Sequence, residues 1–116
     1  MGTIQRYEFT IDDLARARGE FKELSFDGDA PESLAALLQQ ALREPSLWRR
    51  WRAMQPDPDA VDPALGASDP KATVEAHQSD IHVRVTICTT LQHAVIAHRM
   101  TLLIGRHWTL RDVSTV

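Results

Sequence analysis

Residues 72–87 alternate apolar and polar side chains so regularly that they predict a β-hairpin. If Ser79 and Asp80 form a two-residue turn, the numbers of opposite residues sum to 159. One face of the hairpin is then wholly apolar. On the other face, three favourable pairs result: Glu75 with Arg84, Thr73 with Thr86, and His77 with His82. A slip of one residue would scatter both patterns, so the alternation decides which face is buried.

A second alternating segment, residues 3–11, predicts a half-buried strand. Residues 12–26 are open to two interpretations, since their apolar residues have helical spacing but Gly19 interrupts them. We expect a loop and then a strand over residues 20–26, which would form a hairpin with the first strand. Phenylalanine is common in strands and glycine in turns, and both occur in this stretch.

The clearest helix of the chain begins after Asp29, which we predict as its N-cap. Pro31 then lies in the first turn, and Glu32 follows the cap by three residues, as in a capping box. The helix carries a stripe of leucines and ends before Pro45, because a residue that precedes proline is disfavoured in a helix.

A second short helix is predicted over residues 45–54. Helical spacing places Leu47, Trp51 and Met54 on its buried side, with Trp48 beside them. We therefore expect Trp51 to be the tryptophan that matters most to the fold.

The remaining elements follow from composition and periodicity. Residues 55–72 hold four of the six prolines, are acidic and have no periodicity, which predicts a surface loop. Residues 91–104 predict a helix with a broad apolar face that ends at Gly105, although a strand also fits part of this pattern. Residues 107–113 predict a last strand, with residues 114–116 frayed.

These elements predict one α+β domain over residues 1–116, with the acidic proline-rich loop at about 55–72 as a connection inside it. The expected architecture is a mostly antiparallel sheet of four or five strands, with two or three helices packed on one face.

Composition and charge make several classes of protein poor candidates. The net charge is -3 and the isoelectric point is about 5.9, whereas nucleic-acid binders are usually basic. No apolar run is long enough to span a membrane, and no secretory leader is recognisable, so we expect a cytoplasmic protein. Arginine outnumbers lysine by 11 to 2, which is typical of a GC-rich bacterial genome.

Several residues invite a chemical interpretation. His77 and His82 would face each other across the hairpin, but two histidines alone make a poor metal site, so we expect no metal or other cofactor. Cys88 is the single cysteine and could act as a nucleophile with a nearby histidine, although no cysteine-hydrolase motif surrounds it. The acidic run at residues 57–62 lacks the glycine and the final glutamate of a calcium loop.

The most unusual stretch is residues 48–52, which hold two tryptophans and three arginines. Such a segment can anchor a protein interface or stack on nucleic-acid bases. We take Trp48, Arg49 and Arg52, together with His77 and His82, as the candidate binding residues.

These observations favour a small bacterial non-enzymatic binding or regulatory protein that acts through protein–protein contact as a homodimer. Self-association is expected because the apolar face of residues 91–104 exceeds what a surface helix needs and the polar loop is a poor cover for it. A second, unidentified protein partner is also consistent with this class. Two alternatives remain: a small enzyme that uses Cys88 with a histidine, and a nucleic-acid contact through residues 48–52.

Overall fold

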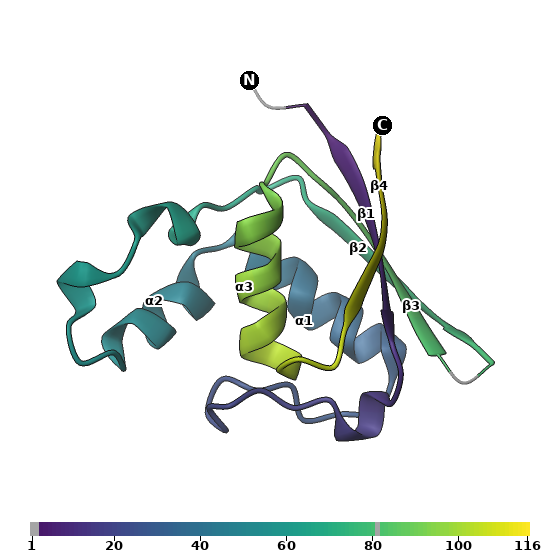
Figure 1. Cartoon of the computed structure of the whole chain (residues 1–116), viewed down its shortest axis with the longest axis horizontal. Helices are drawn as coiled ribbons and strands as arrows, with labels where there is room; N and C mark the ends of the chain where they lie inside the picture. The colour runs from purple at the N-terminus through teal and green to yellow at the C-terminus, as the bar shows by residue number, and fades with distance from the viewer. Residues whose placement is uncertain (1–2, 81) are drawn as a thin grey trace.

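The alternating segments form the strands of a single antiparallel sheet in the computed structural model, which describes residues 3–80 and 82–116. In this part of the chain four strands lie in the order β2-β3-β1-β4, and three α-helices accompany them (Figure 1). The expected α+β architecture is therefore confirmed. The bounds are β1 (Gln5–Ile11), α1 (Pro31–Arg43), α2 (Ser46–Ala53), β2 (Thr73–Ser79), β3 (His82–Thr89), α3 (His93–Ile104) and β4 (Thr109–Thr115).

The connectivity is that of a β-α-β-β-α-β plait into which a further segment is inserted. The helices α1 and α3 cover one face of the sheet, and the other face is open (Figure 1). Residues 44–72, which we call the insert, lie between α1 and β2 and project from the plait at the left of Figure 1. The insert contains α2 and two short 3-10 turns, η2 (Pro58–Ala60) and η3 (Pro63–Gly66).

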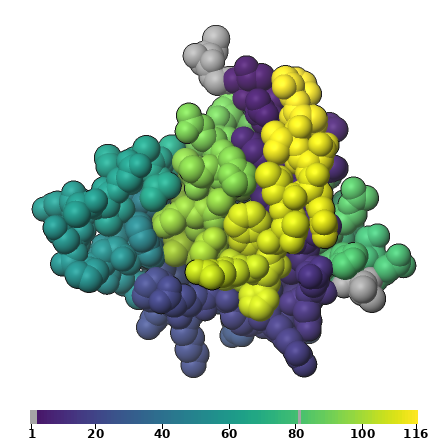
Figure 2. All heavy atoms as spheres, viewed as in Figure 1, coloured from purple at the N-terminus to yellow at the C-terminus, as the bar shows by residue number. Residues whose placement is uncertain are grey.

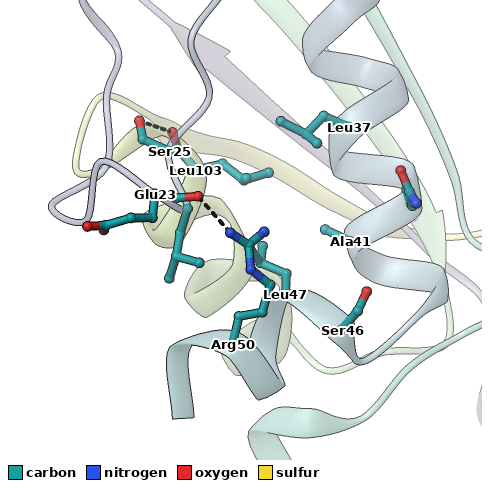
Figure 3. Close-up of a pocket in the computed structure, with 10 residues that line it drawn as sticks. Glu23, Ser25, Leu37, Ala41, Ser46, Leu47, Arg50 and Leu103 are labelled. Atoms are coloured by element: carbon teal, nitrogen blue, oxygen red, sulfur yellow. Dashed lines mark hydrogen bonds between the residues drawn. The ribbon is translucent and has the colours of Figure 1, made fainter. Parts of the chain in front are cut away.

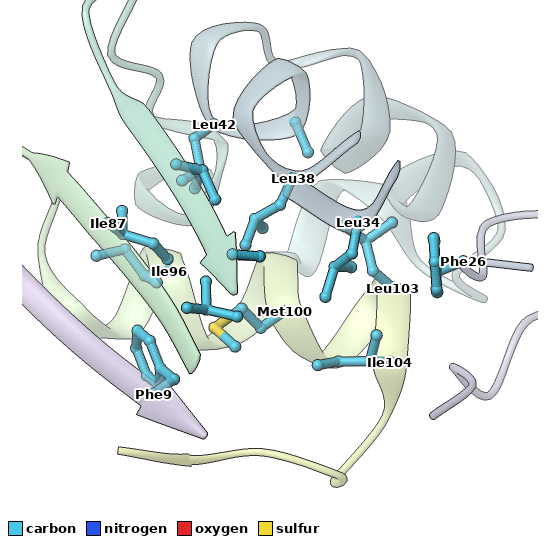
Figure 4. Close-up of a cluster of buried hydrophobic side chains, with 14 of the residues drawn as sticks. Phe9, Phe26, Leu34, Leu38, Leu42, Ile87, Ile96, Met100, Leu103 and Ile104 are labelled. Carbon is cyan, nitrogen blue, oxygen red and sulfur yellow. The ribbon is translucent and has the colours of Figure 1, made fainter. Parts of the chain in front are cut away.

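The core lies between the sheet and the two covering helices (Figure 4). Leu34, Leu38 and Leu42 of α1 are spaced four residues apart, so they share one face of the helix. They belong to the same core cluster as Phe9 and Ile87 of the two central strands, and none of these five side chains is more than 1% exposed. Burial of this aliphatic face holds α1 on the sheet.

The predicted hairpin is confirmed, but its register differs from the expected one by two residues. Val74 pairs with Ile87 and Ala76 with Val85, so opposite numbers sum to 161 and not to 159. A shift of two residues keeps the same side chains on the buried face, because strands alternate with period two. Asp80 adopts a φ of +52°, a left-handed conformation that aspartate tolerates. The expected polar pairs are wrong, and the observed ones are Glu75 with Thr86, Thr73 with Cys88, and His77 with Arg84.

Residues 12–26 form neither the long helix nor the second hairpin. A strand there could not pair with β1, since β3 and β4 already occupy its two edges. Instead, a short turn, η1 (Leu14–Arg16), follows β1, and residues 17–30 run across the C-terminal end of α3. We call residues 17–30 the cap segment. The amide of Phe26 donates to the carbonyl oxygen of Leu103 at 2.8 Å, which satisfies a carbonyl that the helix leaves unpaired.

Two glycines allow the cap segment to approach α3 closely. A Cβ atom at Gly19 would lie 2.2 Å from the carbonyl oxygen of Leu102, so this glycine marks a close contact and not a hairpin turn. Gly105 ends α3 with a φ of +68°, as its place in the sequence predicted, and a Cβ there would lie 2.5 Å from the carbonyl oxygen of Arg18.

Three details at the ends of elements also differ from the predictions. The residue that precedes α1 is Ala30, and no side chain caps the helix, so Asp29 is not its N-cap. The strand β4 continues to Thr115, where fraying was expected. Trp108 and Leu110 face inward as predicted, but both are only half-buried.

The broad apolar face of α3 is covered within the chain. The sheet and α1 pack on it, the cap segment closes its C-terminal end, and the insert contacts it through Arg99. Residues 91–104 therefore form the predicted helix, not a strand, over most of their length. The expectation that the loop at 55–72 is a poor cover was wrong, so self-association needs a different structural reason.

Candidate binding cleft

The helix α2 turns a different side toward the core than its periodicity predicted. Leu47 and Trp48 are buried, each 9% exposed, whereas Trp51 is only half-buried and Met54 is 41% exposed. The rings of Trp51 and of His98 on α3 pack edge to face, with their centroids 4.4 Å apart. Trp48 is therefore the more deeply buried tryptophan of the helix, and the expected placement of Trp51 and Met54 on its buried side was wrong.

Trp48 and Arg52 make contacts that hold the insert together. Gly66 lies against the Trp48 ring, where an added Cβ would be 2.8 Å from a ring atom. The guanidinium of Arg52 lies 5.8 Å from the centroid of the same ring and donates to the carbonyl oxygen of Pro58 at 3.0 Å. It also pairs with Asp59 at 3.2 Å, so an acidic residue of the run at 57–62 has a structural partner.

The other three candidate binding residues lie apart from these two. Arg49 is exposed on α2. His77 and His82 lie on the open face of the sheet but do not face each other, because the register pairs His77 with Arg84 and His82 with Ser79. The Nδ1 atom of His82 instead lies 3.1 Å from a carboxylate oxygen of Asp12. The structure therefore does not gather the five candidate residues into one site.

A cleft of about 350 Å³ lies where α1, α2 and the cap segment meet (Figure 3). Its floor is aliphatic and consists of buried side chains from four elements: Leu24, Ala41, Leu47 and Leu103. Leu37 extends this apolar surface to solvent and is 37% exposed. The cleft exists because the cap segment bonds to the end of α3, beside the point where α1 turns into α2.

The rim of the cleft is polar. Arg50 donates to the carbonyl oxygen of Glu23 at 2.9 Å, which links α2 to the cap segment (Figure 3). The other polar lining residues are Ser25, Gln40 and Ser46. Glu23 and Arg50 bring charges of both signs to the rim, and an aliphatic floor with a charged and hydrogen-bonding rim is the usual composition of a site that receives an apolar side chain and fixes its neighbours. Sequence reasoning missed this cleft, because it depends on where the cap segment lies.

Cys88 lies in a different hollow of about 290 Å³ on the open face of the sheet. All the residues around it are polar or charged: Arg6, Glu8, Thr73, Glu75 and Thr86. None of these lining residues is a histidine, so the histidine partner that the enzyme hypothesis assigns to Cys88 is not part of this hollow. Across the part of the chain that the structure describes, no group of three or more His, Cys, Asp or Glu side chains is arranged to hold a metal ion.

Two buried charged residues were not singled out from the sequence. Asp69 is 8% exposed and accepts hydrogen bonds from the Thr89 hydroxyl at 2.8 Å and from the amides of Lys71 and Thr90. Burial raises the pKa of this carboxyl, but the hydrogen bonds together outweigh it and lower the pKa below its ordinary value of 3.8. Asp69 therefore joins the end of the insert to the end of β3.

Arg99 is the second such residue and is fully buried on α3. A sequence signal for it existed, because Arg99 is four residues from both Val95 and Leu103 and so shares their buried face. Its neighbour His98 is affected as well. Burial lowers the pKa of His98, and the positive charge of Arg99 lowers it further.

Comparison with known proteins gives no relative from which a function could be transferred. The chain matches no protein-family model, no curated protein and no solved structure. In the described part of the chain, no helix is long and apolar enough to cross a membrane.

Proposed function

We propose that this chain is a small non-enzymatic binding protein of the bacterial cytoplasm, which acts through protein–protein contact and also self-associates. The observation that supports this proposal is the cleft between α1, α2 and the cap segment, with its aliphatic floor and its charged rim. At about 350 Å³ the cleft is near the lower end of the range of small-molecule sites, and it has room for one or two side chains of a peptide.

The chemistry of the cleft defines the ligand. Leu37 and Leu47 offer aliphatic contact, so the ligand presents an aliphatic side chain. Arg50 carries a positive charge at the rim, so an acidic residue beside that side chain would be favoured. The ligand class is therefore a short peptide segment with an aliphatic residue next to Asp or Glu.

The two alternatives have weaker support. The alternative enzyme pairs Cys88 with a histidine, and no histidine lines that hollow. A nucleic-acid contact through residues 48–52 would need an accessible aromatic face, whereas Gly66 and Arg52 lie against the ring of Trp48.

Panning a random peptide library on the immobilised protein tests the proposal. We expect enriched peptides to carry the aliphatic–acidic pair, and their binding to be lost in the rim variants Leu37→Asp and Arg50→Glu. The matched control is Thr73→Asp, which adds a charge on the open face of the sheet opposite Cys88 and should bind like the wild type. Absence of enrichment, or enriched peptides that bind both rim variants like the wild type, would contradict the cleft as the binding site.

A further inference from the structure

The two edges of the sheet are not equally protected. At the β2 edge, α1 covers the backbone: Gln39 accepts from the amide of Val74 at 3.1 Å, and Arg43 donates to the carbonyl oxygen of Ala72 at 2.7 Å. At the opposite edge, β4 pairs with β1 on one side, and no described strand pairs with its other side. Figure 2 shows β4 in yellow along the surface of the molecule. A free edge of this kind is a template for another strand.

A β-bulge changes the alternation of side chains in the middle of β4. Glu8 of β1 lies opposite Asp112, and Phe9 lies opposite Leu110, so Arg111 is the extra residue. Arg111 donates to the hydroxyl of Thr10 at 2.9 Å, which places its side chain on the open face of the sheet. Asp112 is on the same face, opposite Glu8. Two consecutive residues of β4 therefore point to one side.

Because of this bulge, the order in which the side chains of β4 point to the two faces of the sheet is the same in both directions from the point between Arg111 and Asp112. Leu110 and Val113 flank that point on the helix-covered side, as their pairing with Phe9 and Tyr7 shows. Thr109 and Ser114 flank it on the open side. Directly opposite residues of an antiparallel pair have side chains on the same face, so a two-fold axis between consecutive residues is impossible in a regular strand. The bulge at this position removes that obstacle.

We infer that the chain forms a homodimer in which β4 pairs antiparallel with β4 of a second copy, about a two-fold axis between Arg111 and Asp112. This inference rests on the self-association in the proposed function and assigns its surface. In that register the numbers of opposite residues sum to 223, and every pair has matched faces. The pairs are Leu110 with Val113, Arg111 with Asp112, and Thr109 with Ser114.

The chemistry of these pairs favours the same register. Arg111 of each copy lies opposite Asp112 of the other, so the register contains two pairs of opposite charge. An axis centred on Asp112 would instead place two aspartates opposite each other. Within one chain, Asp112 already faces Glu8, a like-charge pair that the arginine of the second copy would offset. Val113 is 42% exposed and Leu110 half-exposed, and their mutual contact would bury apolar surface.

Charge reversal with rescue tests the register. Sedimentation velocity over a concentration series should show a monomer–dimer equilibrium for the wild type. Arg111→Asp and Asp112→Arg each place like charges face to face at both contacts, so each should weaken dimerisation by about tenfold. The double variant Arg111→Asp/Asp112→Arg restores opposite charges and should dimerise like the wild type. A wild-type monomer at every concentration would overturn the inference, as would a dimer indifferent to all three variants.

A disulfide test gives an independent measurement that does not depend on the charges. In a Cys88→Ser background, the double variant Leu110→Cys/Val113→Cys should form a covalent dimer on mild oxidation. Neither single variant should do so efficiently, because the register never places a residue opposite itself. Equal crosslinking by the single variants would mean that a different register or surface is used. The β4 residues do not line the cleft, so failure here leaves the peptide-panning result of the proposed function unaffected.

Discussion

Arg99 of α3 donates to the carbonyl oxygen of Ala67 in the insert at 2.6 Å. The same guanidinium donates to the carbonyl oxygens of Leu65, at 3.1 Å, and of Ala41. Ala41 lies in the last turn of α1, where the helix dipole presents its negative end. A fully buried cation is thus stabilised by backbone carbonyls of two segments, and it ties the insert to both helices of the plait.

We predict that Arg99→Met detaches the insert from α3. The methionine fills part of the space, but it leaves the buried carbonyl oxygen of Ala41 and the part-buried carbonyl oxygens of Leu65 and Ala67 without their donor. The expected loss is about 2–4 kcal/mol of the free energy of unfolding, measured by chemical denaturation. Limited proteolysis should then cut within residues 56–68 at a concentration of protease that leaves the wild type intact. Unchanged stability and unchanged cleavage would show that apolar packing alone holds the insert.

The sheet could be predicted from the sequence to a greater extent than the cleft. Alternation identified the strands around Phe9 and Val85. A period-two pattern cannot distinguish two registers that differ by two residues, so the pairing of Glu75 with Thr86 could not be predicted from it. The left-handed conformation of Asp80 occurs in the turn of the observed register. The expected charge pairs were too weak a signal to predict which register forms. The cleft depends on Gly19, whose tight contact with the end of α3 is a long-range relationship. No local pattern distinguishes such a glycine from one in a hairpin turn.

We predict that Trp48→Ala costs more stability than Trp51→Ala, the reverse of what helical periodicity indicated. Trp48 is 9% exposed and contacts both Gly66 and Arg52, so its removal opens a cavity beneath the insert. We expect a loss of about 3–5 kcal/mol for Trp48→Ala. Trp51 is half-exposed, so Trp51→Ala should lower the free energy of unfolding clearly less. Thermal and urea denaturation of the two variants decide this, and equal losses would be inconsistent with the observed orientation of α2.

Asp69 predicts a stability change in acid. Its folded-state pKa lies below the ordinary value of 3.8, because hydrogen bonds from Thr89, Lys71 and Thr90 outweigh the effect of burial. The stabilisation is therefore complete above that pH and is lost as the pH falls through the folded-state pKa. Asp69→Asn should be less stable than the wild type at neutral pH, and the difference should shrink below about pH 4. A constant difference across the acid range would show that the ionised carboxylate contributes nothing.

His98 predicts a second pH dependence, at higher pH and separable from the first. Burial, and then the charge of Arg99, lower its folded-state pKa below the ordinary value of 6.5. As the pH falls, the unfolded chain takes up the proton first, so the stability that neutral His98 supports is present above that value and declines below it. The variant His98→Phe keeps an aromatic ring against Trp51 but cannot titrate. Its free energy of unfolding should fall less than that of the wild type between about pH 7.5 and pH 5, and the exposed control His77→Asn should follow the wild type. If the free energies of unfolding of the wild type and of His98→Phe change in parallel with pH through this range, burial of His98 does not disfavour its charged form.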